Sequence, residues 1–203
     1  MATPPARPAL RARYDRKQQQ VVLQAARVFA ERGYDRTSVQ DLADELGIAA
    51  GGLYHYFGSK EQLLIHICDQ LMDPLLQQAE ELLASGGDPA SRLRELVRLW
   101  VLHVVEHRDH MLVFQQQRHL IEQGEQWRAV RSSRKRFERV VEDLLAGAAD
   151  SGELVLEDNR LALSALLGMV NHTAQWFRPK GRLTPAEIAD GYVRLLTMSR
   201  SIG

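Results

Sequence analysis

Residues 37–60 read Thr-Ser-Val-Gln-Asp-Leu-Ala-Asp-Glu-Leu-Gly-Ile-Ala-Ala-Gly-Gly-Leu-Tyr-His-Tyr-Phe-Gly-Ser-Lys, and they decide the fold. Over residues 39–46 the apolar side chains recur at i, i+3, i+4 and i+7, which predicts one buried face of a short helix. Gly47 follows that helix, where a helix end favours a left-handed residue. Leu53 and Phe57 lie four residues apart, so they predict a second short helix that packs onto the same core.

The first of these helices has two candidate capping residues. Gln40 stands three residues after Thr37, and Asp41 stands three residues after Ser38, so either pair can form a capping box. The second helix has no side-chain cap, because Ala49 occupies the position where a capping residue would stand.

The outer face of the second helix carries three consecutive rings, Tyr54, His55 and Tyr56, followed by the positive charge of Lys60. Exposed rings next to a positive charge at the end of a short helix are typical of a helix-turn-helix that enters the DNA major groove. The alternative is a plain helical hairpin whose rings cover its own core. A preceding helix that ends at Gly33 completes a three-helix unit, with a shared apolar face of Val22, Ala25, Ala26 and Phe29.

Three motifs in this region resemble a known family. They are Ala-Ala-x-x-Phe-Ala-Glu-Arg-Gly-Tyr over residues 25–34, Thr-Ser-Val-x-Asp-Leu-Ala from residue 37, and Leu-Tyr-His-Tyr-Phe-Gly-Ser-Lys-Glu-x-Leu from residue 53. Together they resemble the TetR family of bacterial one-component transcription regulators over about residues 16–66, without a gap. The resemblance implies an all-helical homodimer with an N-terminal DNA-binding domain and a larger C-terminal effector domain.

The resemblance also implies which residues contact DNA. Phosphate contacts fall on Thr37, Tyr54, Tyr56 and Lys60, and the groove-facing positions are Ala50, Gly51, Gly52 and His55; Ser38 joins Thr37 at the start of the first helix. The Ala-Gly-Gly start of the recognition helix offers no side-chain hydrogen bonds. We therefore expect base specificity to rest on the histidine, the two tyrosines and the shape of the DNA.

The chain has 203 residues, of which 45% are hydrophobic and 26% charged, as expected for a globular chain of one or two domains. Its net charge is zero, which taken alone argues against a nucleic-acid partner. The first residues are nevertheless basic, with a single acidic residue, Asp15, among Arg7, Arg11, Arg13, Arg16 and Lys17. We expect residues 1–15 to form a flexible arm that follows the phosphate backbone or enters the minor groove; a solubilising tail is the alternative.

Residues 16–66 then form the DNA-binding domain, with the helix-turn-helix at about 39–58, and residues 67–203 form the effector and dimerisation domain. The single cysteine, Cys68, excludes an internal disulfide and fits a reducing cytoplasm. We interpret it as a small buried hydrophobe rather than a catalytic thiol. The sequence shows no signal peptide and no run of eighteen apolar residues, so we expect a cytoplasmic protein without a membrane partner.

Beyond Lys60 the sequence predicts long amphipathic helices and almost no strand. The fold class is therefore all-α, a three-helix domain followed by a helical bundle, with about nine helices in total. We expect the later helices at about 59–85, from 93 to near 107, 110–123, 125–152, 158–177, and from Pro185 onward.

The helix after Asp158 is apolar nearly all round and carries small residues, Ser164, Ala165 and Gly168, that permit close helix approach. With the last helix it predicts a two-fold interface between two copies of the chain. The alternative is that both helices close the monomer core. The expected interface residues are Leu163, Leu166, Leu167, Val170, Tyr192, Leu195 and Leu196.

A cavity for a ligand is expected between the central helices, although each of its residues alone also fits ordinary packing. The candidate lining residues are Trp100, His103, Phe114, Arg118, Trp127, Arg131, Met169, His172, Trp176 and Arg178. Residues 175–184, Gln-Trp-Phe-Arg-Pro-Lys-Gly-Arg-Leu-Thr, resemble the corresponding stretch of TetR-type repressors of fatty-acid and steroid-ring catabolism. That resemblance implies an acyl-CoA or another hydrophobic carboxylate, with Arg118, Arg131 or Arg178 as the anion partner.

His103, His107 and His110 are spaced so that they can chelate a metal, but the same spacing suits a helix C-terminus, and we expect no metal. The sequence predicts a repressor that releases a palindromic operator when an effector binds and the long helix swings. Its expected partners are duplex DNA, a small hydrophobic or acyl-CoA effector and a second copy of itself, without a cofactor. An activator, a nonspecific DNA binder of the same fold and a helical metal-dependent enzyme are the alternatives.

Overall fold

The computed structural model describes residues 7–156 and 158–197. Within these ranges the chain forms ten α-helices and one short 3-10 helix, with no strand, so the all-α prediction is confirmed. The helices are α1 (Pro8–Arg32), α2 (Val39–Glu45), α3 (Ala50–Phe57), α4 (Lys60–Ala84), α5 (Pro89–Glu106), α6 (Arg108–Gln116), α7 (Arg118–Ile121), the 3-10 helix η1 (Glu125–Trp127), α8 (Arg128–Asp150), α9 (Asn159–Trp176) and α10 (Pro185–Thr197).

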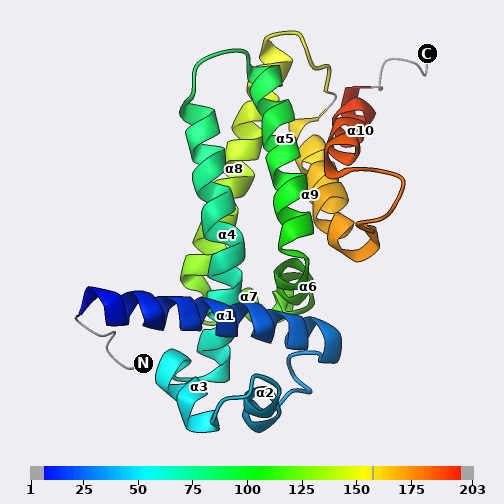
Figure 1. Ribbon diagram of the computed structural model, residues 1–203. Coiled ribbons are helices and arrows are strands. Elements are labelled where there is room, and N and C mark those ends of the chain that lie inside the picture. Colours follow the sequence, from blue (N-terminus) through cyan, green and yellow to red (C-terminus); the bar gives the residue numbers. More distant parts are fainter. Residues whose placement is uncertain (1–6, 157, 198–203) are drawn as a thin grey trace.

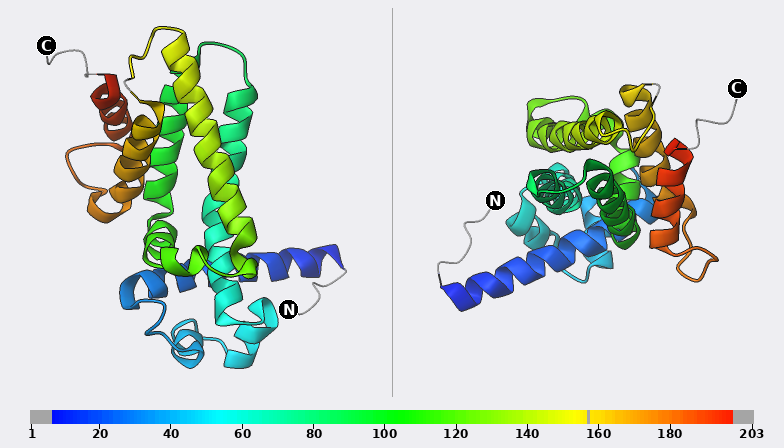
Figure 2. Two further views of the ribbon diagram at one scale, coloured as in Figure 1. Left: turned by 180° about the vertical axis from the view of Figure 1, so that it is seen from behind. Right: turned by 90° about the horizontal axis from the view of Figure 1, so that it is seen from above.

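Helix α1 lies across the base of an upright bundle, with α2 and α3 beneath it (Figure 1). Helix α4 starts in this lower unit and rises into the bundle beside α5 and α8, and α9 and α10 flank α5 on one side (Figures 1 and 2). The short helices α6 and α7 close the bottom of the bundle next to α1. The lower unit and the bundle are therefore joined both by α4 and by the contact of α6 with α1.

The lower unit has one small core. Phe29 of α1, Leu42 of α2, and Leu53 and Phe57 of α3 are fully or almost fully buried in it. The backbone of Gly47, with φ 62°, takes the left-handed conformation that the sequence predicts after α2. A tight turn between α2 and α3 follows from this glycine, and the two helices keep their apolar faces on the same core.

The predicted flexible arm is wrong from residue 8 onward. Pro8 stands at the first position of α1, where a missing amide hydrogen costs nothing, and good helix formers follow it. Arg11 and Asp15, four residues apart on this helix, form an ion pair at 4.0 Å. The first six residues of the arm lie outside the described residues.

Helix α4 follows its predicted bounds closely. The Ser59 hydroxyl accepts a hydrogen bond from the Gln62 amide at 3.0 Å, and Ser85 caps the other end. Cys68 is fully buried in this helix, as predicted, and burial raises the pKa of its thiol. Pro74 lies inside the helix and has no amide hydrogen, so the carbonyl of Gln70 lacks its usual partner one turn later.

Two of the expected helices are interrupted. The predicted helix 110–123 is divided at Gln117 into α6 and α7, and Gly124, with φ 78°, separates α7 from η1. The predicted helix 125–152 begins as the turn η1 before it becomes α8. These breaks fold the chain around the base of α8, where η1 approaches the start of α4. No helix in the described ranges is both long and apolar enough to cross a membrane.

Candidate functional site

The start of α2 uses the second of the two capping options. The Ser38 hydroxyl accepts a hydrogen bond from the Asp41 amide at 3.0 Å, and the Asp41 carboxylate accepts one from the Ser38 amide at 3.0 Å. The Ser38 hydroxyl also donates to the Asp41 carboxylate at 2.6 Å, and this hydrogen bond, followed by the one from the Ser38 amide, lowers the pKa of Asp41. At the start of α3, Ala49 makes no side-chain cap, as the sequence predicts.

Helix α3 presents an open outer face. Leu53 and Phe57 point into the core, Tyr54 is 49% exposed, and His55 is exposed beside it. A β-carbon placed on Gly51 or Gly52 would meet nothing within 4 Å, so this part of the helix surface is free of neighbours. Ala50 and Tyr56 on the same helix are half-buried. The recognition helix therefore begins with residues that have little or no side chain and continues with the aromatic rings of residues 54–56.

The structure buries Thr37 and directs the half-buried Lys60 side chain to the loop between α1 and α2 rather than to this face. The Thr37 side chain is 2% exposed, and its hydroxyl donates to the Gly33 carbonyl at 2.8 Å. The Lys60 ammonium donates to the carbonyls of Tyr34 at 2.9 Å and Thr37 at 2.8 Å, and lies 4.1 Å above the Tyr34 ring. Burial lowers the pKa of Lys60. The Thr37 side chain thus ties the loop between α1 and α2 to the end of α1, and Lys60 ties the same loop to the start of α4.

Sequence reasoning missed Tyr14, which lies on the N-terminal half of α1. Its ring centroid is 4.8 Å from that of Tyr56 and 6.2 Å from that of His55. Burial is the first cause of the raised pKa of Tyr14. The available signal was an aromatic residue within an otherwise basic, polar segment. The contact joins the recognition helix to the part of α1 that the sequence predicts as a flexible arm.

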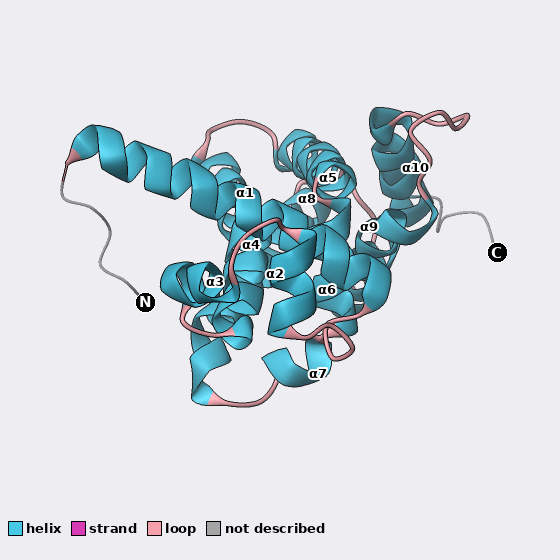
Figure 3. Ribbon diagram, turned by 60° about the horizontal axis from the view of Figure 1, so that its bottom comes forward, coloured by secondary structure: helices cyan, strands magenta, loops and turns pink. Residues whose placement is uncertain are grey.

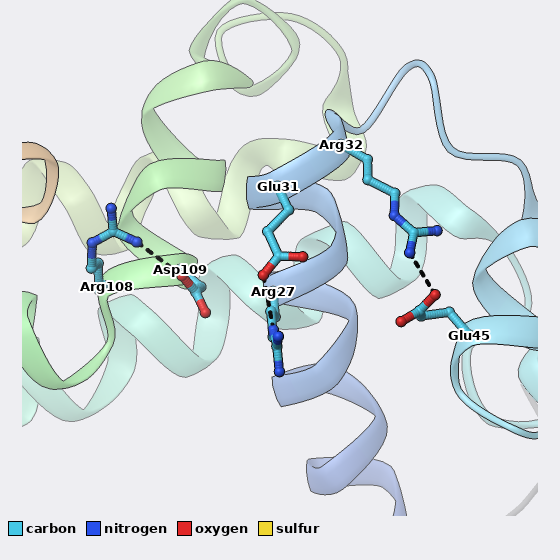
Figure 4. Close-up of polar contacts among 6 residues, drawn as sticks. All are labelled: Arg27, Glu31, Arg32, Glu45, Arg108 and Asp109. Carbon is cyan, nitrogen blue, oxygen red and sulfur yellow. Dashed lines mark hydrogen bonds and ion pairs between the residues drawn. The ribbon is translucent and has the colours of Figure 1, made fainter.

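Three ion pairs lie near the junction of the lower unit with the bundle, each within one of the two parts. Figure 4 shows the Arg27–Glu31 pair on α1, the Arg32–Glu45 pair that joins α1 to α2, and the Arg108–Asp109 pair at the start of α6. Five of these side chains are exposed and that of Asp109 is half-buried, so each pair contributes little to stability.

One polar contact does join the start of α4 to the bundle, and it is partly buried. The Glu61 carboxylate on α4 accepts hydrogen bonds from Gln126 at 2.9 Å and from the Trp127 indole at 3.2 Å. Because Trp127 is buried and Glu61 stands next to the first residue of α4, this contact holds η1 against the helix that leaves the recognition unit.

The bundle contains a cavity of about 510 Å³. Its apolar lining comes from α4, α5, α6, α8 and α9, and its polar lining from α6 to α9. The lining residues are Met72, Leu75, Trp100, Met111, Phe114, Gln115, Arg118, Arg134, Phe137, Glu138, Ser164, Leu167, Gly168, Asn171, His172 and Gln175.

Two guanidinium groups border this cavity. Arg134 donates to the Glu122 carboxylate at 2.7 Å and lies 3.4 Å from that of Glu138, while Arg118 approaches Glu122 at 3.7 Å. The hydrogen bond from Arg134 lowers the pKa of Glu122. The Arg118 side chain is 72% exposed, so its charge is available to an anion at the cavity rim.

Four of the predicted ligand residues line this cavity: Trp100, Phe114, Arg118 and His172. The other predicted residues lie elsewhere, namely His103, Trp127, Arg131, Met169, Trp176 and Arg178. Arg131 donates to the carbonyls of Ile121 and Gly124, both at 2.9 Å, and so stabilises the turn before α8. Arg178 donates to the adjacent Phe177 carbonyl at 3.3 Å. Sequence reasoning missed Met72, Leu75 and Arg134 as lining residues. The periodicity of apolar residues shows which side of a helix is buried, but it does not show where the packed helices leave a cavity.

Two family models match the chain. One is described as "Bacterial regulatory proteins, tetR family" and matches residues 22–67; the other is described as "Tetracyclin repressor-like, C-terminal domain" and matches residues 86–199. The chain belongs to the TetR family.

Similar proteins of the TetR family span nearly the whole chain. The HTH-type transcriptional repressor KstR2 of Rhodococcus jostii is 29% identical over 174 residues, which cover 85% of each chain. The solved structure of PfmR from Thermus thermophilus is 32% identical with a TM-score of 0.78, covering 88% of this chain and 97% of that one. AibR, solved in complex with isovaleryl coenzyme A and operator DNA, is 30% identical with a TM-score of 0.77, covering 89% and 97%. These findings confirm the resemblance to TetR-type DNA-binding regulators.

In this TetR-family chain the predicted dimer residues fall into three environments. Leu166 and Val170 are fully buried in the protomer, so they do not face a partner, and Leu167 lines the cavity. Leu163, Tyr192 and Leu196 are half-buried, and the Tyr192 hydroxyl lies 2.8 Å from that of Thr173. The exposed apolar residues of α9 and α10 are Leu161, Trp176 and Leu195. Gly168 does not serve close packing within the protomer, because a β-carbon there would meet nothing within 4 Å.

Three histidines meet where α5 joins α6. His103 stacks on His107 with ring centroids 4.2 Å apart, and His110 lies 5.8 Å from His107. The His103 Nε2 atom lies 2.7 Å from the Leu71 carbonyl oxygen, whereas the buried His110 Nε2 has no hydrogen-bond partner. Among the residues that the structure describes, no three histidine, cysteine or acidic side chains are placed to hold a metal ion.

The substitution His110→Leu is expected to flatten the dependence of stability on pH. Burial, followed by the charge of His107, lowers the pKa of His110 from 6.5 to about 4. The folded state therefore favours the neutral ring, and this contribution is lost as the pH falls from about 6.5 toward about 4. Between about pH 7 and 5 the loss is about 2 kcal/mol, or roughly 4–8 °C in melting temperature.

Thermal melting of both proteins at the two pH values measures this difference. Asp69 acts in the opposite direction, because burial raises its pKa to about 6, but it is present in both proteins and cancels. If the melting temperature falls by the same amount in wild type and variant between the two pH values, the neutral buried state of His110 is contradicted.

Proposed function

We propose that this TetR-family protein is a homodimeric repressor that releases a palindromic operator when a hydrophobic effector, an acyl-CoA thioester, fills the cavity. One observation carries the proposal: Met72 and Leu75, which line the cavity, lie on α4, and α4 begins three residues after the end of the recognition helix α3. An effector that contacts these two side chains acts directly on the helix that carries the DNA-binding unit.

Two features of α4 support a pivot of this helix. Pro74 lies between the two cavity residues, at a point where one backbone hydrogen bond is missing. Glu61 ties the start of α4 to η1, so a rotation of α4 changes this contact. An effector that binds the rotated state more tightly shifts the population toward it. Paired recognition helices need a separation of about one turn of DNA, so a small rotation weakens both half-sites.

The chemistry of the cavity supports a ligand with an apolar body and an anionic group. Trp100, Phe114 and Phe137 supply apolar lining, and the exposed Arg118 stands at the rim with charge for a phosphate or carboxylate. The charge of Arg134 is already paired with Glu122 and Glu138. The volume of about 510 Å³ falls within the range of small-molecule sites, about 300–1,000 Å³. The similar AibR structure contains isovaleryl coenzyme A and operator DNA, which supports an acyl-CoA here.

The exposed apolar residues of α9 and α10 support the homodimer. Leu161 is 67% exposed and Leu195 is 61% exposed, and Trp176 lies at the other end of α9. Large apolar side chains in such a position indicate a surface that another chain covers. A two-fold pair of these helices matches the symmetry of a palindromic operator.

A thermal-shift series tests the ligand class. At about 100 times its dissociation constant, an acyl-CoA is expected to stabilise the protein by about 2.7 kcal/mol, which raises the melting temperature by roughly 5–10 °C. Isovaleryl-CoA and longer acyl-CoAs are compared with coenzyme A alone and with free fatty acids, and release of a fluorescent operator is measured in parallel. Arg118→Gln is expected to weaken acyl-CoA binding about tenfold, because it removes a charge-assisted hydrogen bond.

Arg139→Gln, an exposed position outside this cavity, is the matched control and should bind the ligand like wild type. Operator binding that persists unchanged at saturating concentrations of every acyl-CoA would sink the proposed release mechanism.

A further inference from the structure

A second groove lies between the N-terminal half of α1 and the recognition helix. Its volume is about 650 Å³, and it lies outside the cavity described above. Figure 3 shows α3 beside this half of α1, which projects beyond the bundle in Figures 1 and 2. The residues that line it are Leu10, Arg13, Tyr14, Arg16, Lys17, Gln20 and Tyr56.

The α1 side of this groove is positively charged. Arg13, Arg16, Lys17 and Gln20 are spaced at i, i+3, i+4 and i+7, so they share one face of α1. Within the described ranges none of the three basic side chains has a carboxylate within ion-pair distance, whereas Arg11 is paired with Asp15. Three uncompensated positive charges on one helix face favour an extended polyanion.

Aromatic contacts fix this charged face relative to the recognition helix. The Tyr14 ring lies against Tyr56 and His55, with centroid distances of 4.8 Å and 6.2 Å. Tyr56 is half-buried beside α1, and His55 stands on the exposed outer face of α3, which in the proposed function faces the DNA bases. The groove is therefore continuous with the DNA-facing side of α3, and it lies on the side of Tyr56.

We propose that this groove binds the phosphate backbone of the operator strand just outside the bases that α3 faces, through Arg13, Arg16 and Lys17. The proposal rests on operator binding in the proposed function and extends the contact surface beyond the helix-turn-helix. Among polyanions, the groove favours duplex DNA because Tyr56 belongs both to the groove and to the recognition helix. DNA that is bound to α3 therefore lies next to the charged face of α1. Phosphate contacts of this kind set register and affinity rather than base specificity.

The experiment compares wild type with the triple variant R13Q/R16Q/K17Q on an operator obtained by selection from random duplexes. Dissociation constants are measured by fluorescence anisotropy over a range of KCl concentrations. The variant is expected to bind at least about tenfold more weakly at moderate salt. Its salt slope should fall by about 0.9 for each phosphate that the variant no longer neutralises, up to about 5.4 for the six altered side chains of a dimer. The variant K135Q/R139Q/K180Q, which removes the same charge at exposed positions of the effector domain, should keep the wild-type slope.

Phosphate ethylation interference locates the contact. Ethylation of phosphates that flank the selected half-sites should weaken wild type and leave the triple variant unaffected. Circular dichroism melting confirms that the variant is folded, and the three single variants replace it if it is not. A wild-type salt slope in the folded variant, or no interference outside the half-sites, overturns the inference while the proposed function stands. If selection yields no palindrome, the proposed function itself fails.

Discussion

Gly168→Leu is expected to produce a repressor that binds its operator normally and no longer responds to the effector. Gly168 lines the cavity on α9, and a β-carbon there would meet nothing within 4 Å, so a larger side chain extends into the space that the effector needs. We expect effector affinity to fall by at least roughly 100-fold, or about 2.7 kcal/mol. Stability without ligand should not decrease, because glycine in a helix interior costs about 1 kcal/mol relative to better helix formers.

Titration of the operator complex with acyl-CoA, together with melting of the free protein, measures both effects. Gly168→Ala serves as the graded control: it should gain stability and lose only part of the response, since a single methyl group occupies little of the cavity. Release of the operator from Gly168→Leu at wild-type effector concentrations would show that the effector binds elsewhere.

The second large effect is expected at Lys60. Lys60→Met removes two hydrogen bonds to the carbonyls of Tyr34 and Thr37 and a cation that lies over the Tyr34 ring. The Thr37 carbonyl loses its donor, and the Tyr34 carbonyl keeps only the Thr37 amide at 3.2 Å. Together with the lost cation–ring contact this costs about 2–3 kcal/mol, or roughly 5–10 °C in the melting temperature of the protein without DNA.

The matched variant Lys60→Arg separates this role from the phosphate contact that the family resemblance implies. Arginine keeps the charge, but its planar group does not fit the two carbonyls that surround the compact ammonium, so it should not restore stability. Normal melting of Lys60→Met combined with a weaker salt dependence of DNA binding would instead place this side chain on the phosphate backbone.

The helix-turn-helix could be predicted from sequence because its signals are local. Ser38 with Asp41 marks the start of α2, Gly47 marks its end, and Leu53 with Phe57 fixes the inner face of α3. Each signal acts within one helical turn, so no knowledge of the rest of the chain is needed.

The cavity in the bundle depends on how the helices cross, and the periodicity of apolar residues does not contain that information. Arg131 and Arg134 lie less than one turn apart on α8, yet Arg131 donates to a turn and Arg134 lines the cavity. In the same way Leu166 and Val170 look like interface residues, but α9 buries them in the protomer. For the N-terminal arm, composition indicates disorder, whereas Pro8 and the helix formers after it start a helix.

The three tryptophans of the chain stand at three different junctions: Trp100 at the cavity, Trp127 at the Glu61 contact between η1 and α4, and Trp176 on the exposed end of α9. Variants that retain one indole each therefore carry an intrinsic fluorophore at the cavity, at the contact between η1 and α4 or on the exposed end of α9. The tryptophan emission of each variant then reports a change at one of these three places, without any attached dye.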